Sequence, residues 1–261
     1  ARTLSKNGIS YVEAGSIDQP ICDRRGDLIC ADWGYAYLAS TNGSGKSVSL
    51  GDYYGMKESF VKNGTLATTK TKWTTRKEED NPAMAYVHNL GSVSNSGKEG
   101  FMMLGYDDIY SIEYMYEKRM GYWKHDGKVT IFDAFEKLRD NYQAIMERCR
   151  AFDELIYDDA EKAGGKKYAE ICSASYRQVI SAHKLFTDKE GNLLWFSKEN
   201  NSNGCVNTVD LTYPSAPLFL VYNPELQKAM MTSIFEYSAS GRWNKPFPAH
   251  DLGTYPIANG Q

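Results

Sequence analysis

The sequence predicts an α+β protein in which an antiparallel β-sandwich is followed by a helical region. Between Ile29 and Ala39, apolar residues alternate with more polar ones, which is the period of a half-buried strand. Turn-forming residues recur at short spacing through the first 110 residues. From Ile131 onward the apolar residues return at steps of three and four, which is the period of an amphipathic helix. We place the domain boundary near residue 122, giving domains 1–122 and 123–261.

The first domain reads as a series of short strands. Turn signals at residues 23–26, 42–45, 63–64, 95–97 and 107–108 separate the runs in which we expect strands, at residues 65–73, 83–90, 101–106 and 111–116. The segment Gly43-Ser-Gly-Lys-Ser47 resembles a phosphate-binding loop, but Ser40 stands where that motif needs its first glycine, and no helix is expected to follow directly. We therefore predict a hairpin turn there.

The second domain opens with Thr130 as a helix N-cap and Asp133 three residues later, an aspartate variant of the capping box. This helix is predicted to run to about residue 163, where Gly164 and Gly165 end it. We expect a second helix over residues 167–184, a β-hairpin over 185–197 and a polar loop over 200–204. Asn223 then caps a helix that has proline at its first position.

Composition narrows the classes of function. With 261 residues, 42% hydrophobic, 24% charged and a net charge of −3, the chain suits a folded protein and gives no electrostatic reason to expect nucleic acid. No apolar run approaches the length of a membrane helix, so we expect no membrane insertion. The aromatic content of 13% suits polar ligands with flat apolar faces, such as sugars or amides, and equally suits sandwich packing.

Metal and nucleophile motifs are missing from the sequence. The four histidines are scattered, and none of the five cysteines forms Cys-x-x-Cys, so we expect neither a metal site nor a cofactor. No Gly-x-Ser-x-Gly elbow occurs, and no cysteine has a histidine nearby in the sequence. Carboxylates are the remaining candidates for proton transfer.

Three carboxylates in the last third of the chain are the predicted catalytic residues. Asp210 lies between two apolar residues, where an acid either pairs with a base or has a raised pKa; a helix cap or a salt bridge is the equal alternative. Glu236 falls late in a predicted helix, where its charge opposes the helix dipole and calls for a partner. Asp251 lies in a loop made rigid by Pro246 and Pro248, although turn formation explains such an aspartate as well.

Four further residues are predicted to bind substrate. Arg177 and Arg242 are cations able to hold a carboxylate through two parallel hydrogen bonds. Asn207 and His250 belong to the same polar, turn-rich stretches as the acids. We expect all these side chains to line one polar pocket that other chain segments complete.

Several separated motifs resemble the glutaminase A family of fungi and bacteria. They are Asp32-Trp-Gly-Tyr35, Ala85-Tyr-Val-His-Asn-Leu-Gly91, Tyr168-Ala-Glu-Ile171, Tyr176-Arg-Gln178, Asn207-Thr-Val-Asp210, Asn223-Pro-Glu-Leu226, Phe235-Glu-Tyr237 and His250-Asp-Leu-Gly-Thr-Tyr-Pro256. The resemblance implies that residues 1–122 are the later part of a β-sandwich and that residues 123–261 begin a six-hairpin (α/α)6 toroid. It also implies hydrolysis of L-glutamine to L-glutamate and ammonia, an extracytoplasmic (periplasmic or secreted) location, and partner segments of the same protein that complete the site.

Two other functions stay open at this point. A glycoside hydrolase of six-hairpin fold would use two carboxylates on a saccharide substrate. A non-catalytic module that binds carbohydrate or protein would keep the same acids in structural pairs. Ammonia release from glutamine, measured beside a panel of glycosides, separates the first two functions, and turnover of neither favours the third.

Overall fold

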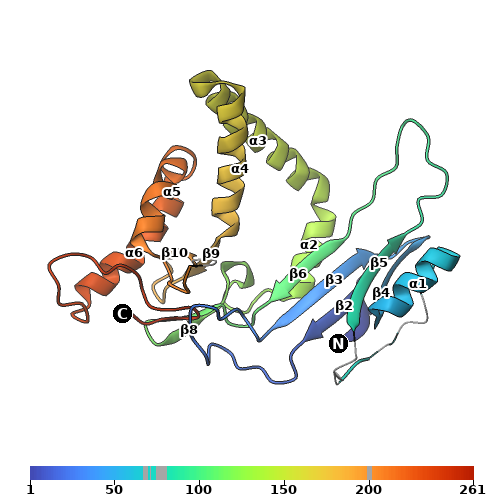
Figure 1. The fold of residues 1–261 in the computed structure, drawn as a ribbon, viewed down its shortest axis with the longest axis horizontal. Coiled ribbons are helices and arrows are strands. Elements are labelled where there is room, and N and C mark those ends of the chain that lie inside the picture. The colour runs from blue at the N-terminus through green and yellow to red at the C-terminus, as the bar shows by residue number, and fades with distance from the viewer. Residues whose placement is uncertain (67–69, 71, 75–80, 199–201) are drawn as a thin grey trace. The chain divides into compact units, whose positions relative to one another are not determined.

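The structure is a computed structural model that describes residues 1–66, 70, 72–74, 81–198 and 202–261 (Figure 1). The chain forms two compact units. The first comprises residues 1–19, 32–108 and 130–140, and the second comprises residues 20–31, 109–129 and 141–261. The fold is α+β, as predicted.

A four-stranded antiparallel sheet organises the first unit, with the strand order β1-β2-β3-β6. Its strands are β1 (Arg2–Lys6), β2 (Ile9–Gly15), β3 (Tyr35–Thr41) and β6 (Met103–Asp107). The alternation that predicted a strand between Ile29 and Ala39 coincides with β3 from Tyr35 onward, whereas residues 29–34 form no strand. Tyr11 of β2 pairs with Ala39 of β3, and Ala39 pairs with Met103 of β6, so these three buried side chains share one face.

A second antiparallel sheet pairs β4 (Lys46–Asp52) with β5 (Pro82–His88), and β4 packs against β2 and β3. The two sheets form the sandwich that the turn spacing predicted. The turn at Gly43, where Lys46 N–H donates to Gly43 O over 3.3 Å, joins β3 to β4 in the other sheet. It is a turn, as expected, but the prediction of a hairpin was wrong because β3 and β4 do not pair.

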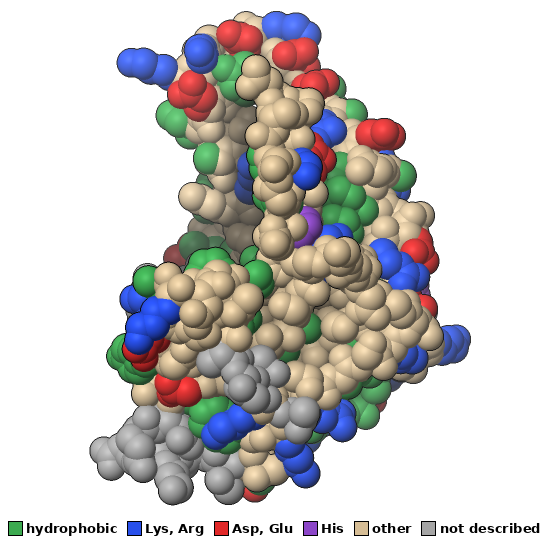
Figure 2. All heavy atoms as spheres, turned by 90° about the vertical axis from the view of Figure 1, so that its right-hand side faces the viewer, with side chains coloured by type: hydrophobic (Ala, Val, Ile, Leu, Met, Phe, Trp, Pro, Cys, Tyr) green, Lys and Arg blue, Asp and Glu red, His purple; other side chains and the backbone are tan. Residues whose placement is uncertain are grey.

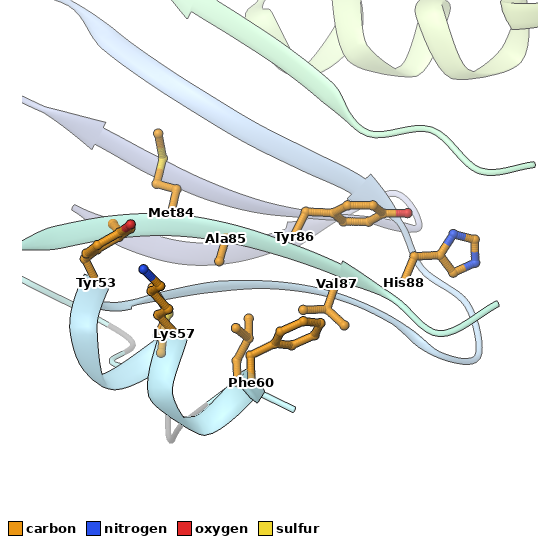
Figure 3. A pocket seen from close by; sticks show the side chains of 11 residues that line it. Tyr53, Lys57, Phe60, Met84, Ala85, Tyr86, Val87 and His88 are labelled. Atoms are coloured by element: carbon orange, nitrogen blue, oxygen red, sulfur yellow. The ribbon is translucent and has the colours of Figure 1, made fainter. Parts of the chain in front are cut away.

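Helix α1 (Tyr53–Asn63) was not predicted. Asp52 caps it by accepting a hydrogen bond from Gly55 N–H over 2.9 Å, and Gly64 ends it with φ 67°. Tyr53 and Phe60 are apolar residues that the helix leaves exposed. Because apolar residues are not confined to its buried side, the sequence shows no clear helical pattern there. Tyr53, Lys57 and Phe60 project from α1 towards β5, around a cavity of about 370 Å³ (Figure 3).

Helix α2 (Ile131–Asp140) covers the outer face of the four-stranded sheet. Phe135 packs on Tyr11 and Tyr37, with ring centroids 5.5 and 6.1 Å apart. The capping box forms as predicted, since Thr130 N–H donates to Asp133 Oδ2 over 2.8 Å. One helix was expected to reach residue 163, but α2 ends before Asn141 and α3 (Tyr142–Gly164) begins after it, in the second unit.

The second unit contains the helical hairpin of α3 and α4 (Lys166–Ser181), which turns at Gly164 and Gly165. The β-hairpin follows as predicted, with β9 (His183–Thr187) and β10 (Leu193–Ser197). A small sheet joins β7 (Ile112–Tyr114) to β8 (Glu117–Arg119) and to β11 (Ile257–Ala258). A short 3-10 helix, η1, spans Tyr122–Lys124.

Helices α5 (Val209–Tyr222) and α6 (Pro224–Ala239) pack together, and α6 lies against β10. Phe219 of α5, Trp195 of β10 and Met230 of α6 form one buried cluster. A larger cluster joins β7, β9, β10 and α6 to the segment that contains Ala249 and Leu252. Helix α6 was predicted, whereas α5 was not, because Pro214 and Pro217 lie within it.

Two sequence predictions fall partly outside the described residues. The strand expected over 65–73 includes residues 67–69 and 71, and the loop expected over 200–204 includes residues 200 and 201. Among the helices that the structure describes, none combines the length and apolar character needed to cross a bilayer.

Acidic and basic side chains lie side by side over the tip of the α3–α4 hairpin, at the top of Figure 2.

Candidate functional site

Backbone pairing between two distant segments builds the main candidate site. Val206 N–H donates to Gly253 O over 2.9 Å, and Tyr255 N–H donates to Gly204 O over 2.8 Å. Farther along, Val209 N–H donates to His250 O over 2.8 Å, which holds the start of α5 beside this histidine. The two polar motifs at the start of α5 and around residue 250 are therefore neighbours, as expected.

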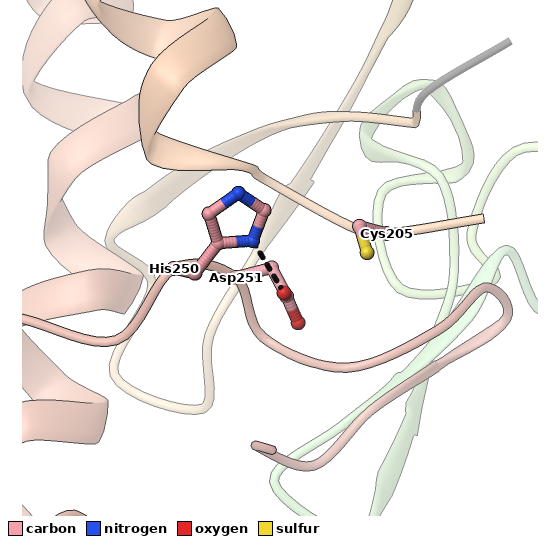
Figure 4. A group of neighbouring side chains, drawn as sticks. All are labelled: Cys205, His250 and Asp251. Atoms are coloured by element: carbon pink, nitrogen blue, oxygen red, sulfur yellow. Dashed lines mark hydrogen bonds and ion pairs between the residues drawn. The ribbon is translucent and has the colours of Figure 1, made fainter. Parts of the chain in front are cut away.

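His250 lies between two carboxylates. Its Nδ1 is 2.9 Å from Asp251 Oδ2, and its Nε2 is 3.7 Å from Asp210 Oδ1 (the contact with Asp251 is shown in Figure 4). Because a carboxylate only accepts hydrogen bonds, Nδ1 carries the proton when the ring is neutral, and Nε2 then offers its lone pair. The His250 side chain is 52% exposed.

The two carboxylates differ in their surroundings. The Asp251 side chain is only 5% exposed. Besides the contact with His250, its oxygens accept hydrogen bonds from Gly253 N–H over 2.7 Å and from Gln261 Nε2 over 2.6 Å. Asp210 is in the first turn of α5, where the helix dipole favours a negative charge, and its side chain is 71% exposed. The apolar setting predicted for Asp210 is wrong because its side chain projects from the surface of α5.

Asn207 lies in the segment that leads into α5 and is bonded to α6. Its side chain is fully buried, and Nδ2 donates to Met230 O over 2.8 Å and to Ser233 Oγ over 2.9 Å. These bonds fasten the segment before α5 to α6. A direct contact between Asn207 and substrate was predicted from its motif. In the structure the side chain is buried, and its hydrogen bonds hold the segment before α5 against α6.

Glu236 and Arg242 line a different cavity, of about 530 Å³, whose lining does not include Asp210 or Asp251. The Tyr114 hydroxyl donates a hydrogen bond to Glu236. Burial raises the pKa of Glu236; the Tyr114 hydrogen bond lowers it, and the charges of Asp188 and Glu190 raise it further. The partner that its place in α6 called for is thus the Tyr114 hydroxyl. Asp210, Glu236 and Asp251 were expected to line one concavity. This cavity contains only Glu236 of the three.

Arg177 lies apart from both groups. It projects from α4 and forms an exposed ion pair with Asp153 of α3. The pair ties together the two helices of the α3–α4 hairpin, with the small energetic effect of an exposed pair. Nothing in the described structure brings Arg177 to His250 or to Glu236.

Sequence reasoning missed Cys205. Its Sγ, a ring nitrogen of His250 and an oxygen of Asp251 all lie within 4.8 Å of one another (Figure 4). No cysteine is near a histidine in the sequence, and only the backbone pairing of residues 204–206 with 252–255 reveals the proximity. Because both Asp251 oxygens already accept hydrogen bonds from protein donors, the group is best described as an oriented histidine with a thiol beside it.

The fold and this site define an α+β protein in which antiparallel sheets precede helical hairpins. Residues 1–159 match the model of a domain of unknown function (DUF5127), and residues 165–261 match the glutaminase A six helical-hairpin domain. The domain boundary near residue 122 and the closed toroid stay predictions.

Curated relatives agree with this assignment. The chain is 33% identical to glutaminase A of Aspergillus oryzae (strain ATCC 42149 / RIB 40) over 236 residues, which are 88% of the chain and 34% of that relative. It is 34% identical over 97 residues to a probable glutaminase of Arthroderma benhamiae (strain ATCC MYA-4681 / CBS 112371), covering 37% of the chain and 11% of the relative. The chain belongs to the glutaminase A family. It spans about a third of the length of the Aspergillus relative.

Proposed function

We propose that the chain carries part of the active site of an amide hydrolase that converts L-glutamine to L-glutamate and ammonia. The observation that carries this proposal is the position of His250 between buried Asp251 and exposed Asp210. Support comes from the family, since relatives with 33 and 34% identity are named glutaminases. We also propose an extracytoplasmic location, on the resemblance alone.

The arrangement suits proton transfer to and from water. Asp251 fixes the ring and its tautomer through Nδ1, which leaves Nε2 as the base that takes a proton from an attacking water. Asp210, 3.7 Å from Nε2, stabilises the imidazolium that results. The same proton then passes to the departing amine, so that ammonia leaves as the carboxylic acid forms.

The partners that we propose are the small-molecule substrate and the remaining segments of the same protein. Exposed apolar side chains on the helices support the second partner: Ile171 on α4 is 64% exposed, Val221 on α5 is 68% exposed and Phe235 on α6 is 60% exposed. Such a concentration on neighbouring helices is typical of faces that pack against further chain. Additional helical hairpins would cover them and complete the wall around His250.

The test is the Asp210→Asn variant in protein that contains the remaining segments. We expect the rate of ammonia release to fall by about 10–10³-fold, because the imidazolium loses a neighbouring charge worth about 1–4 kcal/mol, with little change in Tm. Glu225→Gln is the matched control, because Glu225 is also an exposed acid in the first turn of a helix, where it pairs with Lys228. An unchanged rate in Asp210→Asn would remove Asp210 from the mechanism.

The glycoside hydrolase alternative is tested in the same experiment. Parent protein and variants are assayed with aryl glycosides beside glutamine. Glycoside turnover without ammonia release would overturn the amide hydrolase proposal in favour of the saccharide substrate. Turnover of neither substrate by the longer protein would favour a binding module.

A further inference from the structure

We propose that the cavity lined by Glu236, Asp188 and Arg242 binds a free α-amino acid, with the ammonium on the two carboxyls and the carboxylate on the guanidinium. The cavity lies among β7, β8, the β9–β10 turn and α6, all within the second unit. Its volume of about 530 Å³ is in the range of small-molecule sites. These residues are outside the Asp210–His250–Asp251 group, so the proposal adds a site to the one described above.

Two acids in the lining of the cavity have neutral hydrogen-bond partners. Asp188 is 7% exposed and accepts hydrogen bonds from Asn192 N–H over 2.8 Å and from Asn192 Nδ2 over 2.7 Å. Glu236 accepts a hydrogen bond from the Tyr114 hydroxyl. Within the described part of the chain, no lysine or arginine forms an ion pair with either acid. Burial raises the pKa of Glu236, and the charge of Asp188 raises it further, as expected for two neighbouring acids.

The lining of the cavity also includes a cation, Arg242. The Arg242 guanidinium lies 4.8 Å from the centre of the Tyr116 ring and 3.0 Å from Met115 Sδ. Among the described residues no carboxylate lies within ion-pair distance of it. A planar guanidinium held over an aromatic ring is well suited to take a carboxylate through two parallel hydrogen bonds.

The remaining charges of the lining cancel in pairs. Glu117 pairs with Arg119, and Glu190 lies 3.7 Å from Lys189. What is left is two acids and one guanidinium that line the same cavity without forming an ion pair with each other.

A zwitterion with neighbouring ammonium and carboxylate groups complements this set of charged groups. A neutral sugar would match none of these charged groups, and a bare cation would match only the acids. The amino-acid class follows from the charge pattern and does not depend on the hydrolysis proposed above.

Binding is measured by isothermal titration calorimetry of the chain with L-glutamine and L-glutamate. Two analogues remove one charge each: N-acetyl-L-glutamine lacks the ammonium, and the diamide of L-glutamic acid lacks both carboxylates. We expect saturable binding of the two parent amino acids and at least tenfold weaker binding of each analogue. Absence of binding, or equal affinity for parent and analogues, would overturn the proposal.

Variants locate the site. Arg242→Gln should weaken L-glutamine binding at least tenfold and leave the diamide unaffected, and Glu236→Gln should weaken L-glutamine binding and leave the N-acetyl analogue unaffected. Arg148→Gln, which removes an exposed arginine from α3, is the control and should bind as the parent does. Binding that survives both cavity variants would contradict the assignment. Because the readout is binding, loss of turnover in the Asp210 experiment does not affect this result.

Discussion

The Asp251 carboxylate shows how one buried acid organises its surroundings. It accepts hydrogen bonds from a ring nitrogen, a backbone amide and a side-chain amide, and is almost closed to solvent. The sequence pointed to this residue through its rigid, proline-flanked loop. It did not reveal which atoms surround it, because Gln261 and Cys205 reach it only through the paired segments of the folded chain.

The Asp251→Asn variant is expected to destabilise the protein by about 1–3 kcal/mol, because an amide nitrogen in place of one oxygen faces donors and leaves a buried donor unsatisfied. Urea denaturation measures the change. Asp210→Asn, at an exposed position, should shift the free energy of unfolding by less than about 0.5 kcal/mol. Similar changes in the free energy of unfolding at the two positions would show that burial does not determine how much Asp251 contributes to stability.

Glu236 predicts a pH dependence of stability. Burial, as the largest cause, raises the pKa of its carboxyl above the ordinary value, so the folded protein holds this proton more tightly than the unfolded chain. Stability from this group is therefore present at low pH and is lost as the pH rises through the raised pKa. Glu236→Gln removes that loss, so its Tm should exceed that of the parent near neutral pH, and the gain should disappear below about pH 4. A gain that grows on acidification would reverse the sign and contradict the argument.

Among the elements, those with a strong periodic pattern or a clear cap were predicted, including α2, α4, α6 and the β9–β10 hairpin. Elements with conflicting local signals were missed. Pro214 and Pro217 disguised α5, and the break at Asn141 was hidden because the apolar spacing continues across it. Periodicity records which side of a segment is apolar, but not which of two units that side faces.

The contact between α2 and the sheet provides a test of packing. A Cβ added at Gly105 would lie 2.6 Å from Phe135 Cζ, closer than side chains approach. Gly105→Ala should therefore cost about 1–3 kcal/mol through overpacking. Combining it with Phe135→Leu should recover part of that cost, since the smaller side chain makes room. Urea denaturation of the four members of this double-mutant cycle gives the coupling, and strictly additive costs would argue against the close approach.

For the whole molecule, composition and turn spacing were enough to predict the α+β class and the order of sheets before helices. They did not predict that residues 20–31 join the second unit, although they lie within the predicted sandwich domain. Gly204 N–H donates to Asp27 Oδ1 over 3.3 Å, and Lys118 Nζ donates to Ile21 O over 2.9 Å. Single hydrogen bonds between such distant residues leave no repeated signal in the sequence.

The proposed packing of further chain on the exposed helix faces is tested with Ile171→Asp. In the 261-residue chain this position is 64% exposed, so the substitution should change Tm little. In protein that contains the remaining segments, the same change would bury a charge without a partner and should lower Tm by several degrees. Equal small effects in both proteins would show that Ile171 stays in solvent.

The division of the chain into interleaved ranges has a consequence for protein engineering. The polypeptide passes from one unit to the other after residues 19, 31, 108, 129 and 140. A chimera of two family members joined at a single point within residues 20–140 therefore mixes parental sequence inside at least one unit. Recombination between relatives should therefore succeed only when all segments of a unit are exchanged together, which takes joints after residues 19, 31, 108, 129 and 140.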